Sequence, residues 1–324
     1  MTELSYVLPL RSRDGDGDDD SLDGYLAWLS SRVEVVVVDG SDPSTFRRHR
    51  RRWSPSVRHV RPAPALRCLN GKVWGVRTGL RLAGHDRVVI ADDDVRYDDA
   101  SLDRVAELLA RAEVVRPQNR FDPLPWHARW DTARTLMNRA LGHDHPGTLG
   151  VRRSFLLSIG DYDGDVLFEN LELVRTVTAA GGRVLDAPSV FVGRRPPTLR
   201  RFVEQRPRQA YDDLAQPVKF AAMLAILPAI ATAARLRPRA IATCAGLAIG
   251  AAEIGRIRNG GRPAFDQLSP LFAPLWLLER GAMAWVALAQ RILRGGCPYA
   301  GTVITRAATP TRVLRRRFET TPAG

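Results

Sequence analysis

Three consecutive carboxylates follow an apolar stretch of the chain. Asp92, Asp93 and Asp94 come directly after Arg87–Ala91, whose composition predicts a buried strand. In an extended chain the side chains at i and i+2 point to the same side, so Asp92 and Asp94 can share one ligand. Their oxygens suit a hard divalent cation, which would neutralise charge on a leaving nucleoside diphosphate. An acidic turn, or a cap for the helix expected over 102–112, is the other interpretation.

A second acidic side chain ends another apolar stretch. Asp39 closes Val35–Val38, where its carboxylate could accept hydrogen bonds from a base or ribose, and Gly40 permits close approach. A simple Asx turn would use the same residues. Lys72 stands at an expected helix start, where its charge and the helix dipole both suit a phosphate. A solvated lysine is equally compatible with that position.

Alternating strands and helices are expected to position these residues. Apolar runs predict strands, and helical spacing predicts helices between them: strands at Ser5–Leu10, Val33–Val38, Val57–Val60, Arg87–Ala91 and Glu113–Pro117, and helices at Leu22–Ser30, Lys72–Ala83 and Leu102–Ala112. This order predicts an α/β fold with a mostly parallel, Rossmann-like sheet flanked by helices. Ligands of such sheets bind beyond the carboxyl ends of the strands, where Asp39 and Asp92 are expected.

The last third of the chain is apolar and alanine-rich. Phe220–Ala234 and Ala240–Gly255 fall short of the about 20 apolar residues of a spanning helix. Leu268–Leu293 is also apolar but carries Glu279 and Arg280 near its middle. Short spans, a re-entrant hairpin, interfacial helices and a soluble helical cap all remain open. The basic run Arg312–Arg317 should stay cytosolic. If the catalytic part is cytosolic as well, the number of crossings must be even, so two crossings or none are expected.

These shifts divide the chain into three expected regions. Residues 1–216 form the α/β domain, 217–295 an apolar membrane-associated helical region, and 296–324 a basic cytosolic tail.

Composition excludes several classes of protein. The 324 residues are 45% hydrophobic and 26% charged, which excludes global disorder, and a mean hydropathy of −0.18 excludes a polytopic membrane protein. Three distant cysteines argue against a disulfide scaffold or zinc knuckle, and no secretory signal is expected at the N-terminus.

The chain is strongly basic. Its formal net charge is +13, and almost all of the positively charged residues are arginines. Such a charge is typical of proteins that bind nucleic acid, anionic lipid or phosphorylated substrates, and a general preference of the genome for arginine over lysine would also produce it. Because the arginines are scattered and aromatic residues total 7%, no nucleic-acid partner is expected.

The acidic strand ends belong to an ordered series of motifs. Val35–Asp42, Asn70–Lys72 with Gly79, and Asp92–Asp94 are followed by further segments: Gly160–Gly164, Leu167–Leu173 and Gln205–Gln209. Together they resemble the family 2 glycosyltransferases, which have the GT-A fold. The resemblance covers roughly the first two-thirds of the chain. It departs at Asp39, where only one of two usual acidic residues is kept.

The resemblance implies roles for particular residues. It places the metal on Asp92 and Asp94, and Gln205 and Arg208 near the diphosphate or the acceptor. Nucleotide-sugar contacts are implied for these residues: Pro9, Asp39, Gly40, Ser41, Lys72, Asp92, Asp93, Gln205 and Arg208. The implied cofactor is Mg²⁺ or Mn²⁺.

An inverting transfer needs a carboxylate that deprotonates the acceptor hydroxyl. The family uses the Asp of a Glu-Asp pair, but Asn170 stands at that position and an amide cannot act as a base. Glu169 is therefore the preferred catalytic residue and Glu172 the second, with Arg175 in support. An ordinary surface helix with charges at i, i+3 spacing would look the same.

These observations together predict an inverting, metal-dependent glycosyltransferase. It would move a sugar from a nucleotide-sugar donor to a lipid-linked or cell-envelope glycan acceptor, with its catalytic domain on the cytosolic side of the cytoplasmic membrane. A sugar nucleotidyltransferase of related fold would want a basic Gly-rich loop after the first strand, whereas Arg11–Asp20 is acidic. A degenerate, non-catalytic nucleotide-sugar or anion-binding protein is the other alternative, and donor binding without turnover would identify it.

Overall fold

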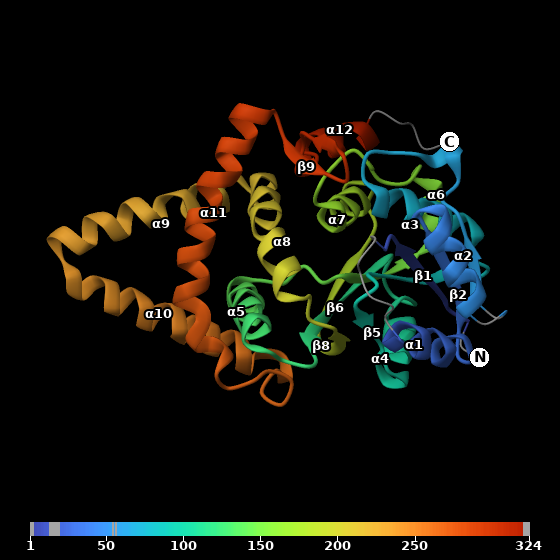
Figure 1. Ribbon diagram of the computed structural model, residues 1–324, viewed down its shortest axis with the longest axis horizontal. Helices are drawn as coiled ribbons and strands as arrows, with labels where there is room; N and C mark the ends of the chain where they lie inside the picture. The colour runs from blue at the N-terminus through green and yellow to red at the C-terminus, as the bar shows by residue number, and fades with distance from the viewer. Residues whose placement is uncertain (1–2, 13–19, 54, 56, 320–324) are drawn as a thin grey trace. The chain divides into compact units, whose positions relative to one another are not determined.

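The computed structural model describes the chain except residues 1–2, 13–19, 54, 56 and 320–324 (Figure 1). The acidic loop expected at 11–20 therefore lies largely outside the described residues. The chain forms two compact units. Unit 1 comprises Met1–Asn119, Pro146–Val192 and Thr309–Gly324, and unit 2 comprises Arg120–His145 and Gly193–Ala308. The units interleave along the sequence, whereas the expected regions are consecutive.

Unit 1 is built on a mixed sheet. Within the described residues the sheet has eight strands in the order β3-β2-β1-β4-β7-β6-β8-β5. Their bounds are β1 (Ser5–Leu10), β2 (Glu34–Asp39), β3 (Val57–Val60), β4 (Arg87–Ala91), β5 (Val95–Arg96), β6 (Val114–Phe121), β7 (Thr148–Arg152) and β8 (Val184–Arg194). β1 is parallel to β2 and β4, and β2 is parallel to β3, as expected. β7 is antiparallel to both β4 and β6, so the sheet is mixed beyond β4.

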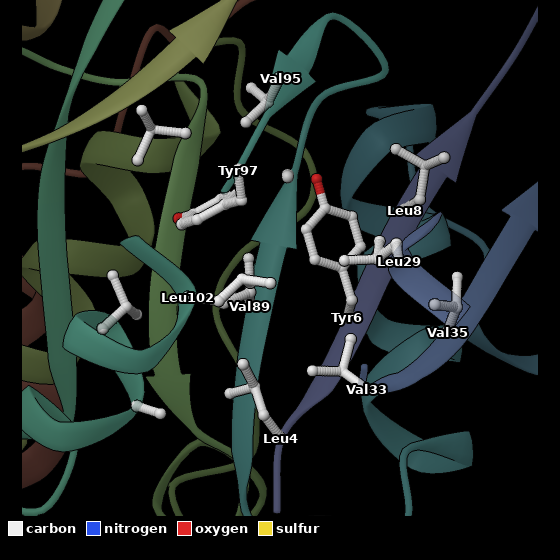
Figure 2. Packing of buried hydrophobic residues seen from close by; sticks show 14 of the residues in the cluster. Leu4, Tyr6, Leu8, Leu29, Val33, Val35, Val89, Val95, Tyr97 and Leu102 are labelled. Carbon is white, nitrogen blue, oxygen red and sulfur yellow. The ribbon is translucent and has the colours of Figure 1, made fainter. Parts of the chain in front are cut away.

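Helices cover both faces of this sheet, which explains why the strands are apolar without alternation. On one face α1 (Asp20–Ser30) and α4 (Asp99–Leu108) enclose a core that includes Tyr6, Leu8, Val35 and Val89 (Figure 2). On the other face α3 (Gly71–Leu82) and α7 (Glu169–Ala179) pack over the alternate strand residues, such as Val7. Burial of one such aliphatic side chain stabilises the fold by roughly 1.5–3 kcal/mol.

Two glycines bring α3 close to the sheet. A Cβ on Gly79 would lie 2.3 Å from Val7 Cγ1, and one on Gly75 would lie 2.8 Å from Pro9 Cβ. Because they stand one helical turn apart, both face β1, and any larger residue would force the helix outward. Gly79, which belongs to the motif series, thus allows the close approach of α3 to the sheet. The first turn of α3 carries Lys72.

Short elements complete unit 1. They are α2 (Pro43–Arg52), η1 (Pro64–Leu66), α6 (Arg153–Ser158) and α12 (Thr311–Glu319). The basic run 47–52 is part of α2, which Asp42 caps by accepting from the backbone N–H groups of Ser44 and Thr45.

Unit 2 is mainly helical. Its elements are α5 (Trp126–Leu141), α8 (Leu199–Asp212), η2 (Asp213–Ala215), α9 (Pro217–Leu236), α10 (Pro238–Ile257), η3 (Arg258–Gly260), η4 (Ser269–Phe272), α11 (Ala273–Arg294) and the strands β9 (Cys297–Tyr299) and β10 (Thr302–Ile304). α9 and α10 form an antiparallel hairpin, which Figure 1 shows in yellow-orange and orange. Among the described residues, three helical segments are long and apolar enough to cross a membrane: Pro217–Leu236, Pro238–Gly260 and Ser269–Arg294.

Buried charges join helices of unit 2. Arg206 on α8 contacts Asp131 on α5 at 3.1 Å and Glu279 on α11 at 3.6 Å. Arg280, the neighbour of Glu279, lies 3.6 Å from Asp213. The two charged residues near the middle of the apolar run 268–293 therefore face other protein helices.

Candidate functional site

Lys72 joins two carboxylates in unit 1. Its Nζ lies 2.5 Å from Asp92 Oδ1 and 2.8 Å from Glu169 Oε1. The side chains of Lys72, Asp92 and Glu169 are 16%, 23% and 10% exposed, so they are largely buried but still reach solvent. Lys72, Asp92 and Glu169 come from three different motifs of the sequence, and Glu169 lies 77 positions after Asp92. The fold brings all three side chains together.

Asn70 fixes the position of Lys72. Its Oδ1 accepts from the backbone N–H groups of Lys72 and Val73 and caps α3. Its Nδ2 donates to the Val166 carbonyl at 3.0 Å, in the segment that leads into α7. One buried amide therefore ties the start of α3 to the approach to Glu169. The Asn70 side chain also takes up the backbone N–H groups at the start of α3 that a phosphate would otherwise bind. The side chain of Lys72 is then the group of this turn that could bind an anion.

A turn between β4 and β5 presents the acidic triplet. The Asp92 N–H donates to Gly147 O at 2.9 Å, and the Val95 N–H donates to Asp92 O at 3.1 Å. Asp92, Asp93 and Asp94 are all half-buried. Carboxylate oxygens on a constrained turn are a suitable donor set for Mg²⁺ or Mn²⁺. The donor chemistry therefore fits the divalent cation that was expected on Asp92 and Asp94.

The ionic partners raise the pKa of Lys72. Burial by itself would lower the pKa, but the charges and hydrogen bonds of Asp92 and Glu169 outweigh burial and raise it above the ordinary value. Lys72 is therefore a permanent cation between the two carboxylates at any physiological pH.

The first turn of α7 carries three residues of the predicted base motif, and each has a different environment. Glu169 faces Lys72, as described above. Asn170 Nδ2 donates to Pro146 O at 2.8 Å, so the residue at the family's base position anchors the helix to the segment before β7. Glu172 is fully buried and its Oε2 accepts from the Thr309 N–H at 2.6 Å. Of the two predicted catalytic carboxylates, the structure brings only Glu169 to Lys72 and Asp92.

Asp39 is enclosed at the end of β2. Its Oδ1 accepts from the Ser41 N–H at 2.8 Å, while its Oδ2 lies 2.8 Å from His49 Nδ1 and 3.0 Å from His59 Nε2. Burial alone would raise the pKa of Asp39, but the hydrogen bonds from His49, His59 and Ser41 hold it well below the usual range. The carboxylate is fully buried. The predicted contact with a nucleotide would therefore require the carboxylate to leave these partners, whereas Gly40 next to it is exposed.

The same three side chains are a possible metal-ligand set. The ligand atoms of Asp39, His49 and His59 all lie within 4.8 Å of one another. A metal on these ring nitrogens would move each imidazole proton to the opposite nitrogen, which then needs a hydrogen-bond acceptor. His59 Nδ1 is buried and has no such partner among the described residues. The arrangement therefore favours a hydrogen-bonded triad over a metal centre.

Sequence reasoning missed His49 and His59. A signal for His49 existed within the basic helix, because Thr45, His49 and Trp53 are spaced by four and are all buried. No pattern in the sequence connects His59 to Asp39; the parallel pairing of β2 with β3 brings them together.

The remaining predicted residues fall into two groups. Pro9 on β1 is the register partner of Val38, one residue before Asp39, and the Gly40 N–H donates to Leu10 O at 2.8 Å. Pro9, Gly40 and Ser41 thus lie at the carboxyl ends of β1 and β2, in unit 1. β1 separates β2 from β4, so two strand spacings, about 10 Å, lie between the strand that ends at Asp39 and the strand that leads into Asp92.

Gln205 and Arg208 lie on α8 of unit 2. Gln205 is exposed, and Arg208 lies over the Tyr299 ring with its Cζ 4.8 Å from the ring centre. Between them, Arg206 is the buried arginine of the motif. The predicted roles of Gln205 and Arg208 near the diphosphate stay predictions.

A scan of protein-family models and a search of curated proteins find no match to this chain. Solved structures do resemble it. A mannosyltransferase from Pyrobaculum calidifontis, in complex with GDP-Man and Mn²⁺, superimposes with a TM-score of 0.52 over 90% of this chain and 87% of its own, at 19% identity.

Two further solved structures cover less of the chain. Glucosyl-3-phosphoglycerate synthase from Mycobacterium tuberculosis, in complex with Mn²⁺, UDP and glucosyl-3-phosphoglycerate, matches 62% of this chain and 74% of its own at 18% identity, with a TM-score of 0.43. Mannosyl-3-phosphoglycerate synthase from Rubrobacter xylanophilus matches 63% and 70% at 18% identity, with a TM-score of 0.40.

The first of these likenesses extends over both the sheet and the apolar helices. The predicted fold class is therefore confirmed: the chain has a GT-A-type α/β fold with an apolar helical region near its C-terminus.

Proposed function

We propose that this protein is an inverting glycosyltransferase that uses a nucleotide-sugar donor and a divalent cation. The observation that carries the proposal is the cluster of Lys72, Asp92 and Glu169. It places a cation, a candidate metal ligand and a candidate base within one sheltered site. The mannosyltransferase that shares the fold supports the proposal, since it was solved with a nucleotide sugar and Mn²⁺.

Asp92 and Asp94 would hold the cation, either Mg²⁺ or Mn²⁺. When bound, it would neutralise the charge that develops on the nucleoside diphosphate as the glycosidic bond breaks. Asp92 would share its oxygens between this ligand and Lys72, whose Nζ lies 2.5 Å from Oδ1. Asp93, together with Pro9, Gly40 and Ser41, would line the nucleotide part of the site.

Glu169 would act as the general base. The acceptor hydroxyl oxygen attacks the anomeric carbon from the face opposite the diphosphate, its proton passes to a Glu169 oxygen, and the carbon–oxygen bond to the diphosphate breaks. The configuration at the anomeric carbon inverts because one displacement occurs. Lys72 holds Glu169 Oε1, so the carboxylate is oriented before the acceptor arrives.

The apolar helices support a membrane setting. Exposed apolar side chains cover unit 2 on α9, α10 and α11: Val218, Leu236, Leu247, Ile254, Leu275, Leu278, Ile292 and Leu293. Surfaces of this extent are unfavourable in water and are typical of contacts with lipid or protein. We therefore propose a lipid-linked or cell-envelope glycan acceptor, with the catalytic unit on the cytosolic side of the cytoplasmic membrane.

The test is a panel of nucleotide sugars with and without Mn²⁺ or Mg²⁺. Purified protein is assayed for protection against heat, for slow donor hydrolysis and for sugar transfer to detergent-extracted envelope lipids. We expect one donor to protect the protein only with a divalent cation, and Asp94→Ala to abolish this protection. Glu169→Gln, which keeps shape and hydrogen bonding, should retain protection while losing transfer.

Three outcomes would contradict parts of the proposal. Failure of every nucleotide sugar to protect the protein would make the acidic strand ends structural. Protection without hydrolysis or transfer would identify a degenerate binding protein. Purification from the soluble fraction without detergent would remove the membrane setting but leave the transferase chemistry.

A further inference from the structure

The C-terminal segment returns to unit 1 and docks on the helix that carries Glu169. Residues 309–319, named here the C-terminal strap, consist of Thr309, Pro310 and α12. α12 packs against α7, and Leu314 is its buried anchor at 3% exposure. The strap therefore reaches α7 through α12, which has one buried apolar side chain.

Two side chains of α7 hold the backbone of one strap residue. Glu172 Oε2 accepts from the Thr309 N–H at 2.6 Å, and Arg175 Nη1 donates to the Thr309 carbonyl at 3.3 Å. Glu172 and Arg175 are three residues apart and lie on one face of the helix. Thr309 itself is 5% exposed, so both hydrogen bonds are sheltered from water.

The first turn of α7 needs such support. Its N-cap is Phe168, which provides no side-chain hydrogen bond to the free amides of the helix. The turn is held by tertiary contacts instead: Asn70 to Val166, Asn170 to Pro146 and Glu172 to Thr309. The third contact is the only one of these made from the C-terminal end of the chain.

We propose that the C-terminal strap positions Glu169 for the transfer reaction, with Glu172 and Arg175 as positioning residues. Glu172, one turn after Glu169, transmits the docking of Thr309 to the catalytic turn. This inference rests on the proposed function for the role of Glu169. It assigns the buried Glu172 carboxylate to the strap and not to the acceptor.

The test compares variants that remove one hydrogen-bonding group with variants that keep it. Thr309→Pro removes the donor N–H, whereas Thr309→Ala keeps it. Glu172→Met removes the acceptor at similar volume, whereas Glu172→Gln keeps an acceptor oxygen. Each full-length protein is examined by hydrogen exchange of residues 166–175 and by transfer kinetics. Glu172→Met decides the question if Thr309→Pro fails to fold.

Thr309→Pro and Glu172→Met should raise exchange in the first turn of α7 by about tenfold, while Thr309→Ala and Glu172→Gln should not. In the two disruptive variants we expect kcat for transfer to fall by about tenfold or more, while donor KM and metal-dependent protection change less than about twofold. A purely structural contact would lower thermal stability without this separation of kcat from KM.

Two results would overturn the inference. Unchanged exchange in Glu172→Met would show that the strap does not hold α7. Raised exchange with an unchanged kcat would show that the strap stabilises the helix without positioning Glu169. If the wild-type protein transfers no sugar to any acceptor, the proposed function fails, and the exchange data still decide whether the strap fixes the turn.

Discussion

Replacing Lys72 by methionine should destabilise unit 1 and make its stability depend on pH. Methionine fills the volume of the lysine stem but leaves Asp92 and Glu169 facing each other without a cation. Their oxygens contact the same Nζ, so they lie at most about 5 Å apart, within the range where like charges repel strongly. Loss of one partner of a buried pair costs about 3–5 kcal/mol. Since these side chains are 10–23% exposed, we expect a loss at or just below the lower end of this range, about 2–3 kcal/mol at pH 7.

The pH dependence follows from linkage. In the wild type, the pKa of Lys72 is raised in the folded state, so its contribution is complete below the lysine pKa of the unfolded chain and is lost only as pH rises through the folded value. In Lys72→Met one of the two carboxylates would instead bind a proton more readily when folded. The variant should therefore regain stability as pH falls from about 7 to 5.

Thermal unfolding of wild type and variant across this pH range measures the effect. For a unit of this size the loss corresponds to a decrease in Tm of about 5–10 °C at pH 7. Arg104→Met, which breaks an exposed pair with Glu107, is the matched control and should change stability by less than about 1 kcal/mol. Adding Glu169→Gln to Lys72→Met should restore part of the loss. A Lys72→Met protein as stable as wild type and insensitive to pH would refute the reasoning.

Three further predictions concern residues that position the site. Asn170→Asp should not increase transfer, because it replaces the N–H donor to Pro146 O with a carboxylate and should cost about 1–3 kcal/mol by thermal unfolding; a gain in kcat would contradict this. Asp39→Asn should destabilise by about 1–3 kcal/mol at pH 7. The pKa of Asp39 is depressed in the folded state, so the stability that its carboxylate contributes is present above the unfolded pKa and is lost as pH falls through the folded value. The difference in stability between Asp39→Asn and wild type should therefore shrink in strong acid. A difference that grows instead would argue against the depressed pKa. Gly79→Ala should clash with Val7 and lower stability by about 1–3 kcal/mol, whereas an unchanged Tm would show that α3 has room to move.

Local patterns were sufficient to predict much of the sheet. The strand predicted at Ser5–Leu10 is confirmed with the same bounds, as are those at Val57–Val60 and Arg87–Ala91. The apolar side chains of Ser5–Leu10 and Arg87–Ala91 are buried on both faces of the sheet, and a short run of apolar residues is enough to indicate such a strand. Helix ends were less exact: the helix expected over 102–112 is α4, Asp99–Leu108, because Asp98 and Ser101 form a capping box before it.

The antiparallel half of the sheet was not predicted. β7 inserts between β4 and β6, and nothing within Thr148–Arg152 specifies which neighbours it takes. Pairing between distant strands depends on how helices pack over them, so it is a property of the whole fold.

The candidate site likewise has features that a local pattern predicts and contacts that depend on the whole fold. The apolar runs before Asp39 and before Asp92–Asp94 were enough to predict that these carboxylates stand at strand ends, because such runs are a local signal for a buried strand. Three contacts depend instead on packing between distant segments: Lys72 bridges Asp92 and Glu169, two histidines enclose Asp39, and the Thr309 N–H donates to Glu172. These contacts join residues up to 137 positions apart. The choice between such partners follows from backbone packing and from the need of each buried polar group for a hydrogen bond, which no local pattern records.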